Sequence, residues 1–170
     1  MSPEQPADDE SGRRQRLVKL IAEGKVRRRV EPEAYPAAMD HLFKAGKLHV
    51  AAPIGPYERS LSRAFPFGSS SLDWSSVPGA VDGGRTDPDN RARDFAAFLR
   101  RMVGDADVDR TVYVIGDGLF NVTIEVRLGV LIGILPEVIA YPQCYYVFPF
   151  PVTWCASLTF VDDMLFGFAP

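Results

Sequence analysis

The sequence predicts an α+β domain, in which an antiparallel sheet of about five strands is covered on one face by helices. Residues 13–46 show helical periodicity, whereas residues 105–170 alternate β-branched and aromatic stretches with turn residues. The chain of 170 residues is long enough to bury one hydrophobic core, and it shows no internal repeat. We therefore expect one domain over residues 13–170.

The N-terminal part is polar and then strongly basic. Residues 1–12 lack apolar periodicity and are expected to form a disordered tail. Residues 13–30 predict a basic amphipathic helix, and residues 31–44 predict a second helix that ends at Gly46. The basic helical part of the domain thus covers residues 13–46.

The middle of the chain carries a weaker pattern. Leu48, Val50 and Ala52 alternate as in a short strand. Residues 53–90 are rich in proline and are expected to form a packed irregular segment. A helix is then predicted from Asp87, as its N-cap, to Gly104.

The sheet is expected in the acidic part of the domain, residues 105–170. Strands are predicted at residues 111–115 and 120–126, joined by a turn at 116–118. Residues 128–140 are apolar throughout and favour a buried helix, with a strand as the alternative. A three-stranded meander is then predicted over 144–148, 153–160 and 164–168.

Two cysteines allow two readings. If Pro149 and Phe150 form a two-residue hairpin loop, Cys144 and Cys155 lie opposite each other and could form a disulfide. The alternative is two buried thiols in a reducing cytosol.

Charge is distributed unevenly along the chain. Residues 105–170 hold eight acidic and two basic residues, a net charge of −6, whereas residues 1–104 carry a net charge of +3. An acidic, aromatic-rich region suits a protein that binds a basic partner.

The motifs that would indicate catalysis or cofactor binding are missing. His41 and His49 are eight residues apart, which fits no metal motif, and the Asp105, Asp107, Asp109 run departs from the calcium-loop pattern. We therefore expect no catalytic residue, no metal and no cofactor. The sequence lacks a signal peptide and a run of about 20 apolar residues, so we expect a cytoplasmic protein without a membrane partner.

Several short motifs resemble those of bacterial immunity proteins, which are encoded beside polymorphic or contact-dependent-inhibition toxins. The similarity covers about residues 60–170 and consists of packing and turn motifs: LDWSSVP (72–78), VYVIGDGL (112–119), LPE (135–137), YPQCYYV (141–147) and WC (154–155). The resemblance implies a non-catalytic protein that binds a cognate toxin, such as a basic nuclease, and blocks its active or substrate-binding surface.

The expected contact surface combines carboxylates with aromatic anchors, because acidic inhibitors compete for basic surfaces and aromatic residues supply most binding energy. The candidate partner-binding residues are Asp117, Glu125, Tyr145, Trp154, Asp162 and Asp163.

Two other functions stay open at this point. A small enzyme could use Asp117 and Glu125, if the two carboxylates meet near one strand end. A nucleic-acid-associated regulator could use the basic helix of residues 13–30, although no nucleic-acid motif supports it and nucleic acid is not an expected partner.

Overall fold

The computed structural model describes residues 35–69, 71–118 and 120–170. All of them belong to one compact unit, Glu33–Pro170. The expected disordered tail (1–12), the basic helix (13–30) and the start of the second helix lie outside the described residues.

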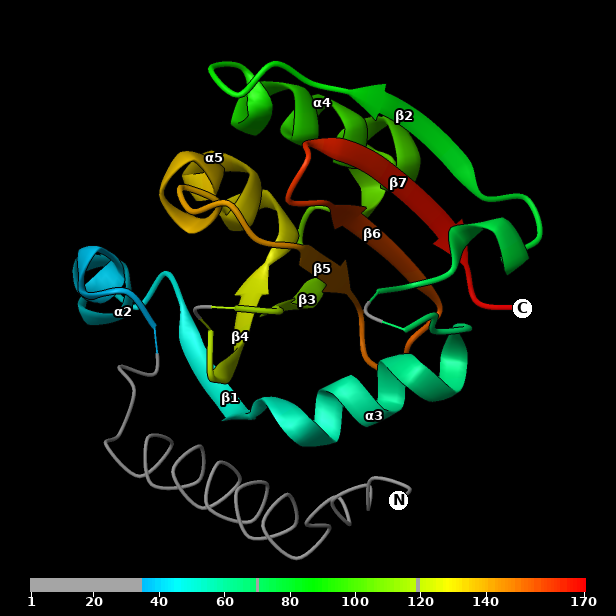
Figure 1. The fold of residues 1–170 in the computed structure, drawn as a ribbon. Helices are drawn as coiled ribbons and strands as arrows, with labels where there is room; N and C mark the ends of the chain where they lie inside the picture. Colours follow the sequence, from blue (N-terminus) through cyan, green and yellow to red (C-terminus); the bar gives the residue numbers. More distant parts are fainter. Residues whose placement is uncertain (1–34, 70, 119) are drawn as a thin grey trace, which may run out of the picture. The chain divides into compact units, whose positions relative to one another are not determined.

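The described residues form an α+β fold built on one antiparallel sheet of seven strands, in the order β1-β4-β3-β5-β6-β7-β2 (Figure 1). The elements are η1 (Ala37–Met39), α2 (Asp40–Lys44), β1 (His49–Pro53), α3 (Ile54–Ala64), η2 (Trp74–Ser76), β2 (Val81–Arg85), α4 (Arg91–Val103), η3 (Asp105–Asp107), β3 (Thr111–Gly116), β4 (Val122–Arg127), α5 (Leu128–Val138), β5 (Tyr145–Phe148), β6 (Trp154–Leu158) and β7 (Asp163–Phe168).

The predicted fold class and most predicted elements are confirmed. β3, β4 and the β5–β6–β7 meander occupy the expected segments. The apolar segment 128–140 is a helix, α5, with six of its eleven residues buried, so the strand alternative is wrong. The sheet has seven strands where about five were expected.

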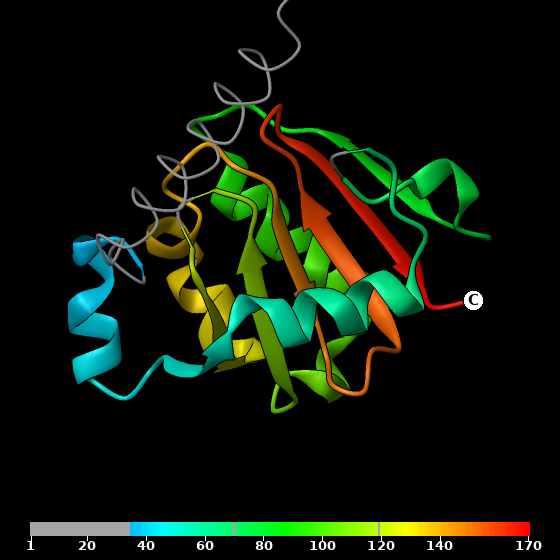
Figure 2. The ribbon, with the colours of Figure 1, turned by 60° about the horizontal axis from the view of Figure 1, so that its bottom comes forward.

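Helices cover both faces of the sheet, which corrects the expectation of cover on one face. Figure 2 shows α3 crossing in front of the strands, with α4 and α5 behind them. Successive side chains of a strand point to opposite faces of the sheet. Because both faces are covered, every residue of β5 and β6 is buried. The core cluster on the α3 face contains Leu61, Phe65, Leu72, Val77, Ile115, Cys144, Tyr146, Phe148 and Cys155.

The segment 53–90 is irregular only in part, because it contains two longer elements that were not predicted, the helix α3 and the strand β2. Pro53 precedes α3 and Pro56 lies in its first turn, where a missing N–H costs nothing. β2 contains Gly83 and Gly84, which carry no strand propensity. A Cβ atom at Gly83 would lie 2.6 Å from Phe98 Cε2, so tertiary packing selects this glycine.

The predicted boundaries of α4 are right at one end. Gly104 ends the helix with φ +84°, as expected. The helix begins at Arg91, because Asp87 caps a preceding turn instead, accepting a hydrogen bond from the backbone N–H of Asp89 at 2.9 Å.

The two glycines of α5 differ in their surroundings, and this gives a stability prediction. A Cβ at Gly129 would lie 3.2 Å from the Val108 carbonyl oxygen, whereas a Cβ at Gly133 would meet nothing within 4 Å. Gly133→Ala should therefore raise the free energy of unfolding by about 0.5–1 kcal/mol, through lower backbone entropy of the unfolded chain. Urea titration tests this, and Gly129→Ala is the matched control. Equal stabilisation by both variants would contradict the close approach at Gly129.

Candidate functional site

Antiparallel pairing brings three of the predicted binding carboxylates to the same end of the sheet. Asp117 follows β3, and its backbone N–H donates to the Cys144 carbonyl at 3.2 Å, just before β5. β6 runs antiparallel to β5, so the hairpin between β6 and β7 turns at this end too. Asp162 lies in that hairpin and Asp163 begins β7.

Asp117 is held in place by the predicted turn at 116–118. Its Oδ1 accepts a hydrogen bond from the backbone N–H of Cys144 at 2.9 Å, which ties the loop before β5 to the end of β3. A Cβ at Gly116 would lie 2.7 Å from Gln143 Nε2, so close packing against Gln143 requires glycine there. The Asp117 side chain is exposed.

The β6–β7 turn presents two apolar side chains to solvent. Phe160 is 65% exposed and Val161 is 39% exposed. The Asp162 N–H donates to the Thr159 carbonyl at 2.9 Å, and the Asp163 N–H donates to Thr159 Oγ1 at 3.0 Å. Asp162 adopts φ +65°, a conformation that aspartate tolerates better than most residues. The turn is therefore well fixed while its apolar tip stays uncovered by the described residues.

Arginines accompany both carboxylates of this turn. Arg91 Nε lies 3.1 Å from Asp162 Oδ1, within ion-pair distance but not aligned for a hydrogen bond, and both side chains are 14% exposed. Arg85 Nε donates to Asp163 Oδ1 at 2.9 Å, on the surface. Asp162 and Asp163 therefore mainly hold the turn in place. Since each is paired with an arginine, the net negative charge of this region comes from the neighbouring carboxylates.

We define the strand-end surface as Asp117, the β6–β7 turn (159–163) and the neighbouring segment 85–94. The backbone N–H of Thr86 donates to the Asp162 carbonyl at 3.0 Å, which joins the last two parts. The ionised side chains are Arg85, Asp87, Asp89, Arg91, Arg93, Asp94, Asp117, Asp162 and Asp163. With six carboxylates and three guanidinium groups, the surface carries a net charge of −3.

Asp94 links this surface to the acid stability of the fold. A hydrogen bond from Thr86 Oγ1 at 2.6 Å, and then one from Arg93, lower the pKa of Asp94. A group whose pKa is lower in the folded state contributes stability above its unfolded pKa, near 3.8, and this is lost as the pH falls through the folded value.

We accordingly expect Asp94→Asn to flatten the loss of stability between about pH 5 and pH 2. Urea midpoints measured across that range would show it, with the exposed Asp89→Asn as control. An unchanged acid limb in Asp94→Asn would contradict the role of the Thr86 bond.

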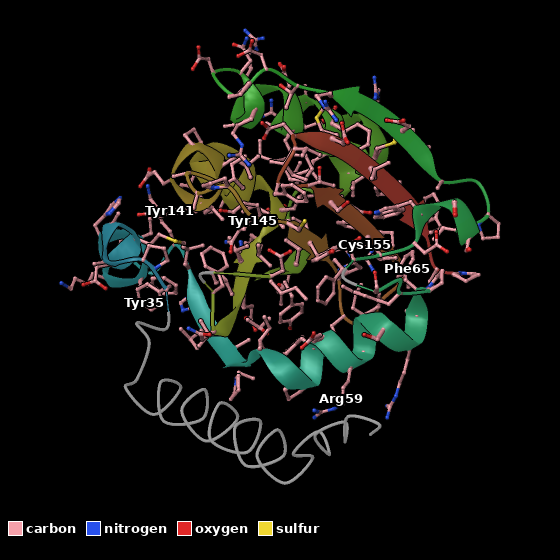
Figure 3. The ribbon with its side chains drawn as sticks, viewed as in Figure 1. Tyr35, Arg59, Phe65, Tyr141, Tyr145 and Cys155 are labelled. Atoms are coloured by element: carbon pink, nitrogen blue, oxygen red, sulfur yellow. The ribbon has the colours of Figure 1, made fainter. Side chains whose placement is uncertain are left out.

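The two predicted aromatic anchors are core residues, which corrects that expectation. Tyr145 is 0% exposed and Trp154 is 3% exposed. Tyr145 lies inside the fold beside α5 (Figure 3), and its hydroxyl donates to the Tyr141 carbonyl at 2.9 Å. Neither side chain can reach a partner of the folded chain. The exposed aromatic residue beside the carboxylates is Phe160.

The sequence-based prediction overlooked these two residues, because Phe160 was placed at the end of the predicted strand 153–160 and Val161 was assigned to no element. A signal was nevertheless present. An aromatic and a branched apolar residue directly before two aspartates, at the tip of a predicted hairpin, are unusual, because hairpin tips favour Gly, Asn, Asp and Ser.

Glu125 lies away from Asp117, so the two carboxylates do not form a pair. Glu125 is in β4 and faces Tyr113 across the β3–β4 ladder, whereas Asp117 is four residues beyond Tyr113. At about 3.3 Å per residue along the strand, Asp117 lies about 13 Å from Tyr113, the residue that faces Glu125. The geometry that the enzyme alternative needs is not present between these residues.

The cysteines do not face each other either. Tyr145 pairs with Leu158 and Val147 with Ala156, so the connection is longer than two residues and Cys155 falls opposite Phe148. Both cysteines are free and buried. Burial raises the pKa of Cys144 to about 11 and that of Cys155 well above its usual value. Neither thiol is activated as a nucleophile.

The remaining candidates have structural roles or lie elsewhere. His41 Nε2 is 2.5 Å from Glu137 Oε2, joining α2 to α5. Across residues 35–69, 71–118 and 120–170, no three His, Cys, Asp or Glu side chains gather closely enough to hold a metal ion. The basic residues of segment 13–30 lie outside the described ranges.

The chain matches no protein-family model, and no curated protein matches it. Within the described part of the chain, no helix is long and apolar enough to cross a membrane.

Proposed function

We propose that this protein is a non-catalytic binding protein, of the immunity type that the motif resemblance implies, which neutralises a cognate bacterial toxin. The observation that carries the proposal is Phe160, which is 65% exposed on a fixed turn within a surface of net charge −3. Binding energy concentrates in such aromatic anchors, and surrounding carboxylates speed association with a basic surface.

The partner that fits is a basic protein whose active or substrate-binding surface attracts an anionic substrate, as in a nuclease. An acidic surface with an apolar centre would cover such a region and exclude its substrate. The proposed contact residues are Phe160, Val161, Asp117 and the outer carboxylates Asp87 and Asp89. Asp162 and Asp163 support the turn through Arg91 and Arg85.

Affinity capture from the native host's lysate with an N-terminally tagged protein tests this function, with retained proteins identified by mass spectrometry. We expect one basic protein in stoichiometric amount at moderate salt, and inhibition of its toxic activity by the purified chain. Capture of nucleic acid alone, lost as the salt concentration rises, would contradict the proposal and support the nucleic-acid alternative.

The structure provides a matched pair of variants for this experiment. Phe160→Ala should weaken binding of the captured partner at least about tenfold, since it removes a central anchor. Phe168→Ala is the control, because Phe168 is 61% exposed and lies at the opposite end of β7. Equal weakening by the two variants, or none by Phe160→Ala, would show that the strand-end surface is not the interface.

A further inference from the structure

Four side chains from separate elements meet at the edge of α3, away from the strand-end surface. The ring of Tyr57 in α3 packs against that of Tyr113 in β3 in a tilted arrangement, with centroids 4.7 Å apart. Phe150, in the loop after β5, is edge-on to both rings, at 5.8 and 6.3 Å. Glu125 in β4 pairs in register with Tyr113, so it lies on the same face of the sheet.

The cluster is rigid and accessible at the same time. Phe150 is 58% exposed, while Tyr57, Tyr113 and Glu125 are half-buried. The three rings hold one another in contact, so little side-chain entropy would be lost when a ligand binds beside them. Each of the four residues therefore keeps part of its surface open to solvent.

The carboxylate of Glu125 has no countercharge within the described part of the chain. His49 is opposite it on β1 and Arg127 is two residues further along β4, yet neither forms an ion pair with it. Burial and then the charge of Glu125 raise the pKa of Tyr113 to about 12, so this hydroxyl stays protonated near neutral pH and can donate to the carboxylate.

We propose that the cluster of Tyr57, Tyr113, Glu125 and Phe150 binds an arginine side chain presented by a partner protein. A guanidinium group is planar, so it can stack against the aromatic rings while its N–H groups pair with the carboxylate. Lysine lacks the planar, forked group that stacks on a ring and presents paired N–H donors to a carboxylate. An anionic group would be repelled by Glu125, and an apolar group would leave that half-buried carboxylate without a countercharge.

This inference is independent of the proposed function, because its test needs no toxin. The full-length protein, labelled with nitrogen-15, would be titrated at low salt with the peptide acetyl-Gly-Arg-Gly-amide and followed by NMR. The same peptide with citrulline in place of arginine is the control, since citrulline has nearly the same shape without the charge. We expect saturable shifts at Tyr57, Tyr113, Glu125 and Phe150 with the arginine peptide, and none with the citrulline peptide.

Two variants distinguish this site from general electrostatic attraction. Glu125→Gln should lower the affinity at least about tenfold, because a charge-assisted pair is lost. Glu137→Gln, which removes a carboxylate from α5 on the other face of the sheet, should leave the affinity unchanged. Shifts spread over the whole surface, equal shifts with citrulline, or equal loss in both variants would overturn the proposal. The spectra of the free variants show whether each remains folded.

Discussion

Phe148→Ala is expected to lower the free energy of unfolding by about 3–5 kcal/mol. Phe148 is 0% exposed and belongs to the core cluster on the α3 face, together with Leu61 of α3 and Phe65, which directly follows that helix. The substitution removes the transfer free energy of the ring and leaves a cavity between β5 and α3. The cavity cannot collapse, because β5 is the central strand of the sheet and is held by neighbours on both sides. Urea titration followed by fluorescence and circular dichroism would measure the loss.

The matched control is Phe160→Ala, the same substitution at a side chain that is 65% exposed. It should change the free energy of unfolding by no more than about 0.5 kcal/mol, because little apolar area is buried there. This control also shows that a binding defect of Phe160→Ala is not a folding defect. Similar losses in the two variants would contradict the burial of Phe148 beneath α3.

Gly167→Val is expected to destabilise the fold by about 3 kcal/mol, although valine ordinarily favours strands. A Cβ at Gly167 would lie 2.8 Å from Val77 Cγ1 and 3.2 Å from Trp74 Cζ3. Val77 is 4% exposed, and β7 lies between β6 and β2, so neither the neighbours nor the strand can move aside cheaply. The steric clash could be relieved only if the segment around η2, which carries Trp74 and Val77, moved away from the sheet.

Equilibrium unfolding in urea tests this, and Gly133→Ala is the comparison. Both variants add carbon atoms at a glycine, but a Cβ at Gly133 meets nothing within 4 Å. The two substitutions should therefore change stability in opposite directions. Stabilisation by Gly167→Val would mean that the segment carrying Trp74 and Val77 does not cover this part of the sheet.

At the candidate site, as in the fold, local sequence shows where the turns lie but not which side chains are buried. The sequence places Asp117, Asp162 and Asp163 in recognisable turns, and antiparallel pairing brings these turns to one end of the sheet. It could not separate buried from exposed aromatics, because Tyr145 and Phe160 both lie in apolar stretches of the meander. Tyr145 is buried because a helix packs on its strand, whereas Phe160 is exposed because it lies in the turn beyond the end of β6.

The sequence by itself determined the elements whose signals are local. The β5–β7 meander, the turn at 116–118 and the end of α4 at Gly104 all follow from side-chain period and turn chemistry over a few residues. Contacts between distant segments decided the rest: the strand β2, the cover of α3 on the second face, and the β5–β6 register that separates Cys144 from Cys155. The physical reason is that pairing register and burial depend on packing across the sheet, and a short stretch of sequence carries no information about which segment will lie against it.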